Sequence, residues 1–267
     1  MTKMIVIGAG VMGASVAFRL AQAGADVTVL EATRIGGGTS GVSFAWTNAH
    51  KKPPKPYHDL NVGGMKAHAA LKDEFGATPW WHGGGSLEWE LEPDRADQRA
   101  NVEQLRAWGY AAEWIDLKQV QELEPDINPA VIGDAPVAYF PEEGWLDPVV
   151  YAHAMLSAAQ RRHGAKIVCG AKVVDLLMTG DLVRRARQLL PSIGEVEPEA
   201  ARIAIRPIPG DHFSAIGPMP RTSGYYLAVT HSGVTMSPFL GAAVADEVVR
   251  GKQRRELADF RPARFFN

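Results

Sequence analysis

The sequence has little of several features that mark specialised classes of protein. Its 267 residues contain a single cysteine, Cys169, which excludes an internal disulfide and agrees with a reducing compartment. Lysine and arginine number 28 against 30 for aspartate and glutamate, a net charge of −2, so the basic excess typical of nucleic-acid binding is absent. No apolar run is long enough to span a bilayer, and the N-terminus lacks a signal-peptide pattern. We therefore expect a cytoplasmic protein with no nucleic-acid partner and no membrane span.

Residue spacing also disfavours a metal site and a reactive thiol. The 8 histidines are scattered without the spacing of metal ligands, so no metal is expected. Cys169 ends an apolar, strand-like run, KIVC, which predicts a buried and unreactive side chain. What remains is a globular composition, 46% apolar and 22% charged, and a length that suits one large domain or two ordinary ones.

The N-terminal region predicts a βαβ unit with a dinucleotide-binding turn. An apolar strand over 4–7 is followed by the turn GAGVMG, a helix over 12–23 and a second strand over 27–30. Three glycines would make the tight turn, let the backbone approach a pyrophosphate, and allow close helix–strand packing, in the order Gly8, Gly10 and Gly13.

Glu31 adds a preference among nucleotides. It lies 18 residues after Gly13, at the end of the second strand, where a carboxylate accepts hydrogen bonds from a ribose hydroxyl and repels a 2′-phosphate. The pattern therefore favours FAD or NAD over NADP and does not separate the first two. The alternative is a glycine turn that binds nothing.

The rest of the chain alternates helical patterns with loops. The segment HSGVTMSP is expected to be a loop between a strand, YYLAVT, and the last helix, and ARIAIRP is expected to be an alternating strand. Helices are expected over 64–75, 94–108, 147–164, 181–190 and 240–248.

Four segments together resemble the FAD-dependent amine oxidoreductases related to D-amino-acid oxidase, glycine oxidase and monomeric sarcosine oxidase. They are MIVIGAGVMGASVAFRLAQAGADVTVLE, GGGTSGVSFAW, WLDPVVYAHAMLSAAQRRHGAKI with the VV strand after it, and RPIPGDHFSAIGPMP with GYYLAVTHSGVTMSPFLGAAVADEVV. The resemblance implies an α/β fold, in which a Rossmann-like FAD-binding domain with a parallel sheet is joined to a reduced antiparallel substrate domain. The FAD-binding domain would comprise 1–80, 147–180 and 207–267, and the shortened substrate domain 81–146 and 181–206.

The resemblance also assigns residues to parts of a non-covalently bound FAD. Cys169 is far in sequence from the flavin loop, which argues against a covalent link. The N-terminus of the last helix would stabilise the negative charge of a reduced flavin; the alternative there is an ordinary strand–loop–helix corner. The implied contacts are Gly8, Gly10, Gly13 and Glu31 at the ADP part, Thr39 and Ser40 at the pyrophosphate, Ala45 and Trp46 beside the flavin, the backbone of Val173 at the adenine, and Gly233, Val234 and Thr235 at the pyrimidine edge.

Two residues are implied in substrate binding or catalysis. Arg206 matches an Arg-Pro site that holds the substrate carboxylate in glycine oxidase-like relatives, a role that suits the two parallel hydrogen bonds of a guanidinium. His231 would lie near the flavin. The alternatives are a surface arginine on an amphipathic strand and a histidine that only hydrogen-bonds within its loop. A second arginine of these relatives is replaced by Ser232, so the resemblance does not identify the substrate.

The sequence departs from these relatives at VDLLMTGDLVRRARQLLP. They carry a segment on the order of a hundred residues between the adenine-contacting strand and the late helix, where this chain has only Thr179 and Gly180. That segment includes a central strand of the parallel sheet. Without it, the first strand and YYLAVT either pair directly or keep unpaired edges, and the substrate pocket loses walls.

These features predict a redox enzyme and leave two alternatives open. The resemblance implies an FAD-dependent oxidoreductase that oxidises the C–N bond of a small amino acid or secondary amine by hydride transfer, with dioxygen or another acceptor taking the electrons. The shortened middle supports a catalytically impaired or inactive relative that binds FAD weakly or not at all. An NAD-dependent dehydrogenase would explain the fingerprint but not the C-terminal flavin loop.

Overall fold

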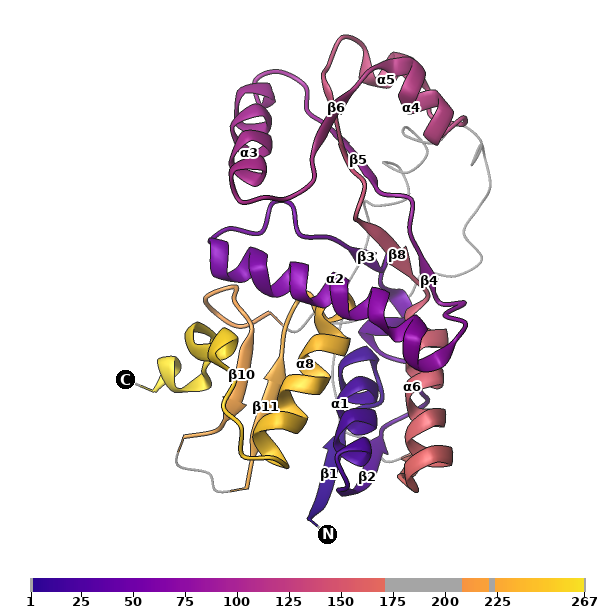
Figure 1. Cartoon of the computed structure of the whole chain (residues 1–267), viewed down its shortest axis with the longest axis vertical. Helices are drawn as coiled ribbons and strands as arrows, with labels where there is room; N and C mark the ends of the chain where they lie inside the picture. The colour runs from indigo at the N-terminus through magenta and orange to yellow at the C-terminus, as the bar shows by residue number, and fades with distance from the viewer. Residues whose placement is uncertain (1, 171–207, 221–223, 267) are drawn as a thin grey trace. The chain divides into compact units, whose positions relative to one another are not determined.

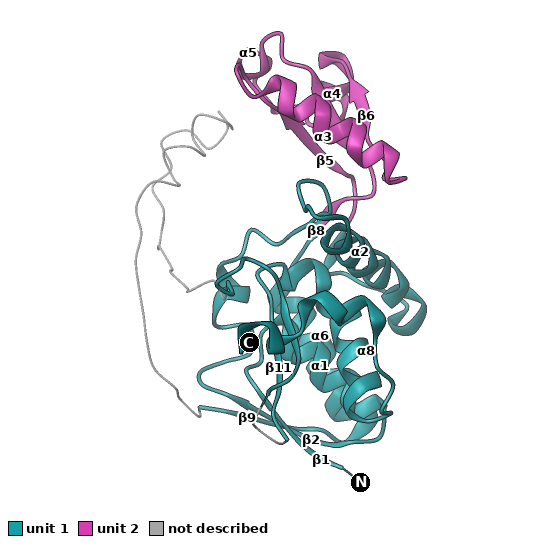
Figure 2. Cartoon of the chain, turned by 90° about the vertical axis from the view of Figure 1, so that its left-hand side faces the viewer, with its two compact units in different colours: residues 1–82, 145–176, 204–267 teal, residues 83–144, 177–203 magenta. Residues whose placement is uncertain are grey.

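The computed structural model describes residues 2–170, 208–220 and 224–266, which form two compact units (Figure 2). Within these ranges, unit 1 comprises residues 2–82, 145–170 and those from 208 onward, and unit 2 comprises residues 83–144. The expected helix at 181–190, the expected strand at 201–207 and the shortened joint around Thr179 and Gly180 lie outside the described residues.

Unit 1 is built on a three-stranded parallel sheet, here called sheet A. β1 (Lys3–Ile7), α1 (Val11–Gln22) and β2 (Asp26–Glu31) follow one another, which confirms the predicted βαβ unit to within one residue at each boundary. β9 (Lys166–Cys169) pairs with the other side of β2, so the strand order is β1-β2-β9. This is the predicted α/β fold class.

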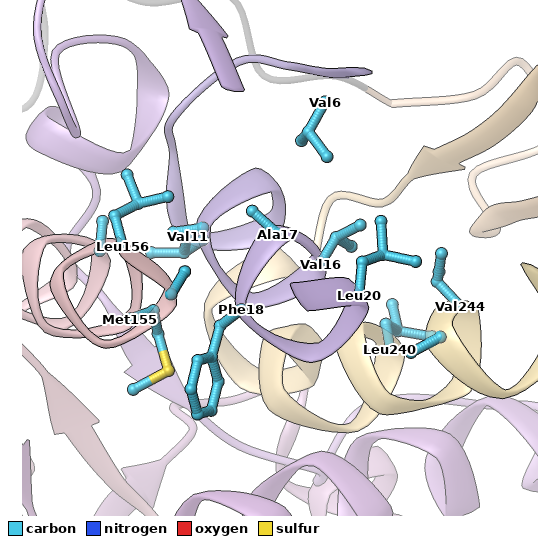
Figure 3. Close-up of a cluster of buried hydrophobic side chains, with 14 of the residues drawn as sticks. Val6, Val11, Val16, Ala17, Phe18, Leu20, Met155, Leu156, Leu240 and Val244 are labelled. Atoms are coloured by element: carbon cyan, nitrogen blue, oxygen red, sulfur yellow. The ribbon is translucent and has the colours of Figure 1, made fainter. Parts of the chain in front are cut away.

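Three helices pack in a row, with α1 between α6 (Pro148–His163) and α8 (Gly233–Val248) (Figure 1). α6 begins with Pro148 in its first turn, as the sequence predicts, and the Asp147 side chain before it accepts two backbone hydrogen bonds of 2.9 Å. No helix in the described ranges is long and apolar enough to cross a membrane. Figure 3 shows the buried side chains that fill the space between the three helices: Val11, Val16, Ala17, Phe18 and Leu20 from α1, Met155 and Leu156 from α6, and Leu240 and Val244 from α8.

Two helices begin earlier than their sequence patterns predict. α2 runs over Lys55–Phe75, so the expected start at residue 64 is wrong. Pro56 lies in its first turn, where an N–H would have no intrahelical partner in any case. α8 begins at Gly233 and contains Pro238, so the expected loop over this stretch is wrong as well. In both places proline lies within a helix rather than before it.

A separate two-stranded sheet precedes α8. β10 (Ala215–Pro218) and β11 (Tyr226–Val229) pair in antiparallel fashion. In the described part of the chain β11 does not pair with β1, so the alternative in which these two strands close directly on each other is wrong. Cys169, at the end of edge strand β9, is exposed, so its expected burial is wrong too. Both corrections concern the borders of sheet A.

The C-terminus is tied to β11 and α8 by one carboxylate. Glu247 accepts two hydrogen bonds from Arg261, at 2.6 and 2.8 Å, and one from the Tyr226 hydroxyl at 2.7 Å. Burial acts to raise the pKa of Glu247, but these donors outweigh it and hold the pKa below its usual value.

The remaining short elements of unit 1 are η1 (Thr39–Val42), β3 (Trp46–Thr47), β4 (Trp81–His82), β8 (Gly144–Leu146, whose first residue belongs to unit 2), η3 (Arg255–Phe260) and η4 (Pro262–Phe265).

The described residues of unit 2 form a small antiparallel sheet and three helices. The central strand β7 (Val137–Phe140) pairs with β5 (Ser86–Trp89) on one side and β6 (Glu113–Ile115) on the other. The buried carboxylate of Glu143 accepts hydrogen bonds of 2.6 Å from Ser86 and from Tyr110. The role of this unit as a substrate domain stays a prediction. Its elements are β5 (Ser86–Trp89), α3 (Arg95–Ala107), β6 (Glu113–Ile115), α4 (Leu117–Leu123), α5 (Pro129–Ile132) and β7 (Val137–Phe140).

The contact between α1 and α8 predicts that Gly241→Ala destabilises unit 1. A Cβ on Gly241 would lie 2.8 Å from the backbone carbonyl of Ser15, so the helices must separate. We expect the free energy of unfolding to fall by about 1–2 kcal/mol, because overpacking outweighs the gain in helix propensity. Urea unfolding followed by circular dichroism measures the change. Gly210→Ala is the control, since no atom lies within 4 Å of its built Cβ; equal stability of both variants would contradict the prediction.

Candidate functional site

A cavity of about 1920 Å³ lies within unit 1. Its lining comprises β1 and the glycine turn after it, the first turns of α1 and α8, parts of residues 31–52, and β11 with the turn that follows it. Most of the predicted cofactor residues belong to this lining: Gly8, Gly10, Gly13, Glu31, Thr39, Ser40, Trp46, Gly233, Val234 and Thr235.

The three fingerprint glycines have the backbone geometry that their sequence positions predict. Gly8 adopts a φ of 97°, which favours glycine, and its N–H donates to the Leu30 carbonyl at 2.8 Å. A Cβ on Gly10 would lie 2.8 Å from Ser40 Oγ, and a Cβ on Gly13 would overlap the Gly8 carbonyl. The turn therefore keeps the N-terminus of α1 close to β1 and open toward the cavity.

Glu31 and Ser40 are both held by backbone N–H groups near that N-terminus. The Glu31 carboxylate accepts from Ala9 N–H at 2.8 Å and from Thr33 N–H at 2.9 Å. Ser40 Oγ accepts from Val11 N–H at 3.1 Å. Thr33 Oγ1 donates to the same oxygen as Thr33 N–H, at 3.3 Å, while the oxygen that accepts from Ala9 retains a further lone pair, so Glu31 can still accept a hydrogen bond from a ligand hydroxyl. Thr33 is a contact that sequence reasoning missed.

The segment after η1 brings Ala45 and Trp46 to the N-terminus of α8. Ala45 is buried with a φ of 58° and does not belong to the cavity lining. Its carbonyl accepts a hydrogen bond from Leu146 N–H at 3.2 Å. The Trp46 carbonyl accepts from Thr235 Oγ1 at 3.3 Å, which links β3 to the first turn of α8. The ring of Trp46 lines the cavity. Its buried Nε1 has no hydrogen-bond partner among the described residues.

The first turn of α8 lies against α1 and α2. A Cβ on Gly233 would lie 3.2 Å from Met12 Cγ, and one on Gly64 of α2 would lie 2.8 Å from Met236 Cα. Asn48 N–H approaches Thr235 Oγ1 at 3.4 Å. These contacts place the N-terminus of α8 at the same cavity as that of α1, and both termini carry positive partial charge.

His68 is a residue of this region that sequence reasoning missed. Pro238 has no N–H, so the carbonyl of Val234 loses the bond that residue i+4 of a helix normally donates. His68 Nε2, from α2, hydrogen-bonds this carbonyl at 2.8 Å and is therefore the protonated ring nitrogen. Burial lowers the pKa of His68 to about 4, and the bond to Val234 acts in the opposite direction. Its spacing from Pro238 in the sequence gives no signal of this contact.

His231 is held by Tyr57, a second residue that the sequence did not indicate. The Tyr57 hydroxyl lies 2.8 Å from His231 Nε2 and 2.8 Å from Ser232 Oγ. Tyr57 is almost fully buried in α2, and His231 is half-buried in the cavity lining. The Tyr57 hydroxyl holds the His231 imidazole just before the N-terminus of α8. Tyr57 is therefore a positioning residue.

Two predicted site residues lie outside the described part of the chain. They are Val173, expected at the adenine, and Arg206, expected at the substrate carboxylate. The structure therefore brings together the predicted cofactor residues of β1, β2, the 39–46 segment and α8. Among the described residues, no group of three or more histidine, cysteine, aspartate or glutamate side chains could hold a metal ion.

The residues of the cavity fit the ADP and flavin parts of FAD. Because Gly10 has no Cβ, Ser40 Oγ can lie beside the turn at the N-terminus of α1, and a helix N-terminus suits a pyrophosphate. Glu31 offers a carboxylate acceptor at the end of β2, and Trp46 belongs to the cavity lining near the N-terminus of α8. Gly8, Gly10, Glu31 and Ser40 would hold the ADP part, and Trp46 and the α8 N-terminus would face the flavin.

Comparisons with known proteins agree with this geometry. Residues 3–181 match the family described as FAD dependent oxidoreductase. The chain is 27% identical over 242 residues to glycine oxidase from Bacillus licheniformis, and 27% identical over 183 residues to mitochondrial dimethylglycine dehydrogenase from Homo sapiens. The alignments cover 87% and 67% of the chain but only 62% and 20% of these relatives. The crystal structure of glycine oxidase from Geobacillus kaustophilus superposes over 98% of each chain with a TM-score of 0.82 at 19% identity, which shows the fold.

The buried His68 predicts a loss of stability in mild acid. Its folded pKa of about 4 lies below the value of 6.5 for an ordinary histidine, so between these values the unfolded state binds the proton more strongly. The stabilisation is complete above pH 6.5 and falls as the pH drops toward 4; between pH 7 and 5 the loss is about 2 kcal/mol. His68→Gln keeps an N–H donor for the Val234 carbonyl and does not titrate.

Urea unfolding at pH 7 and pH 5 measures this loss. We expect the His68→Gln variant to lose about 2 kcal/mol less than the wild-type chain over the same interval. His153→Gln replaces an exposed histidine of α6 and should retain the wild-type loss. Equal losses in the wild-type and His68→Gln chains would show that His68 does not cause the pH dependence.

Proposed function

The chain belongs to the FAD dependent oxidoreductase family, because residues 3–181 match that family, and we propose that it oxidises the C–N bond of a small amino acid or secondary amine. The observation that carries this proposal is the convergence of the glycine turn and the α8 N-terminus on one cavity. The relatives support the class of substrate, since they are named glycine oxidase and dimethylglycine dehydrogenase. The chain covers less than two thirds of either relative, so the activity of the whole relative is part of the proposal.

In this proposal the chain's residues bind and orient rather than donate or accept protons. FAD, when bound, supplies the acceptor for a hydride from the carbon beside the amine nitrogen. Gly10 and Ser40 would hold the pyrophosphate at the α1 N-terminus, and Glu31 would accept from the ribose. The N–H groups at the start of α8, over 233–235, would stabilise negative charge in the cavity, because a helix N-terminus carries positive partial charge.

Substrate binding is proposed for Arg206 and His231. Arg206 would grip the substrate carboxylate with two hydrogen bonds, and its fixed charge would select substrates that carry this group. His231, held by Tyr57, would orient the substrate from the cavity wall. Dioxygen or another acceptor would complete the reaction, and binding of FAD would be non-covalent.

One observation favours a second candidate, an inactive relative with weak or no FAD binding. Ile5 and Ile7 of β1 are 68% and 74% exposed, although a parallel sheet is normally covered on both faces. A strand that the described part of the chain leaves uncovered on this face holds the glycine turn less firmly. The two candidates make opposite predictions about flavin uptake and flavin reduction.

Uptake of FAD tests the cofactor site. We expect the purified chain to take up FAD with the yellow absorbance of a flavoprotein, and Glu31→Gln to raise the Kd about tenfold, because a charge-assisted hydrogen bond becomes a neutral one. Fluorescence titration of the flavin measures both constants. Glu113→Gln changes an exposed glutamate in unit 2 and should leave the Kd unchanged. A chain that stays colourless after addition of FAD contradicts the proposal.

Anaerobic reduction tests the reaction. We expect glycine, sarcosine or a D- or L-amino acid to bleach the bound flavin in the absence of oxygen. Arg206→Met should raise the concentration needed for half-bleaching about a hundredfold, because the carboxylate loses a bidentate charged partner. Arg202→Met, in the same segment, is the matched control and should have little effect. Bound flavin that no amine bleaches would instead favour the inactive relative.

A further inference from the structure

The free edge of β1 presents an ordered row of backbone hydrogen-bonding groups. Asp26 N–H donates to Thr2 O at 3.0 Å and Gly8 N–H donates to Leu30 O at 2.8 Å, so residues 2 and 8 of the chain face β2. The backbone of alternate strand residues faces alternate sides. Lys3, Ile5 and Ile7 therefore present their N–H and C=O groups away from β2, where no described strand pairs with them.

A second strand edge faces the same cavity. Met219 N–H donates to Tyr225 O at 2.9 Å, and β10 continues this pairing along β11. By the same alternation, Tyr226 and Ala228 direct their backbone groups away from β10. Both residues line the cavity, as do all five residues of β1, Lys3 to Ile7. Among the residues that the structure describes, two strand edges without a partner thus face one space.

That space is larger than one cofactor requires, and one end of it is apolar. Small-molecule pockets usually enclose about 300–1,000 Å³, against about 1920 Å³ here. Away from the glycine turn, the lining beside the two edges consists of apolar side chains of α1 and α8: Val16, Leu20, Val244 and Val248. A small polar ligand would satisfy neither these side chains nor two rows of backbone groups.

Sheet A is also uncovered on one face in the described part of the chain. Ile5 and Ile7 project from the face opposite the buried Val6, and they are 68% and 74% exposed. Ile7 pairs with Leu30, and Leu30 pairs with Val168, which is 45% exposed. An apolar row therefore continues across the three strands and would lie beside anything that pairs with β1.

We propose that the edges of β1 and β11 form a docking slot for an extended, apolar strand of a second polypeptide. Only a polypeptide backbone supplies alternating donors and acceptors that can pair with the backbone groups of both edges, as in binding by strand addition. The occupant would run parallel to β1 and carry apolar, β-branched residues on both of its faces, because a strand within a parallel sheet is covered on both sides. This inference concerns strand pairing and does not depend on the proposed oxidation.

A labelled synthetic peptide tests the slot with the full chain. Its core alternates valine and isoleucine between lysine flanks, and the matched control peptide carries N-methyl groups at every second core residue, which removes the donors on one edge. We expect saturable binding of the first peptide by fluorescence anisotropy, and at least about tenfold weaker binding of the second. Hydrogen exchange at Ile5 and Ile7 should slow at least about tenfold when the first peptide is bound.

A substitution at the edge provides the second arm. The Ile5 N–H faces away from β2, so Ile5→Pro removes a donor to the slot without removing a β1–β2 hydrogen bond. It should weaken peptide binding about tenfold, whereas Ile5→Val should not. Should Ile5→Pro fail to fold, the N-methylated peptide decides the question with the unaltered chain.

Three results would overturn the proposal. One is equal binding of the two peptides, and another is absence of saturable binding. The third is protection of the Ile5 and Ile7 amides in the chain alone, which would mean that the edge is already covered. If the chain alone is then a dimer by ultracentrifugation, a second copy of this chain covers the edge instead.

Discussion

The close approach of backbones at three glycines is the constraint on which unit 1 depends. Gly13 lets α1 pack on the carbonyl of Gly8, Gly241 lets α8 pack on Ser15 of α1, and Gly64 lets α2 pack on the first turn of α8. A side chain at any of these positions would push one backbone away from its neighbour. Because all three contacts are short, α1 and α8 lie side by side (Figure 1). The first turns of both helices line the same cavity.

The electrostatic character of the cavity follows from that packing. Two helix N-termini at one cavity concentrate partial positive charge, and the charged side chains in the lining are Lys3, Glu31 and Lys52. The carboxylate of Glu31 is held by the N–H groups of Ala9 and Thr33. The resulting site attracts an anionic ligand at the helix ends and offers one acceptor for a hydroxyl, which suits a dinucleotide.

The parts of the fold that depend on neighbouring residues could be predicted from the sequence, and those that depend on distant contacts could not. The βαβ unit and the start of α6 near Asp147, with Pro148 in the first turn, are local patterns, and both are confirmed. Pro238 was expected in a loop, because sequence alone does not reveal that His68 compensates for its missing N–H. Tyr57 likewise becomes recognisable only when α2 brings it to His231. The exposure of Cys169 depends on what covers sheet A, which no local pattern contains.

The glycine turn and the unpaired edge belong to the same strand, so they are mechanically linked. β1 ends at Ile7 and the glycine turn begins at Gly8; within the described chain, β1 is paired on one side only, with β2. A strand on the other side would fix the position of Ile7, and hence the direction in which the turn leads into α1. A strand that binds at the edge and orders the turn lowers the entropy cost of nucleotide binding, because the nucleotide then no longer has to order the turn itself. By reciprocity, a nucleotide at the α1 N-terminus would favour strand pairing at the edge by the same free energy.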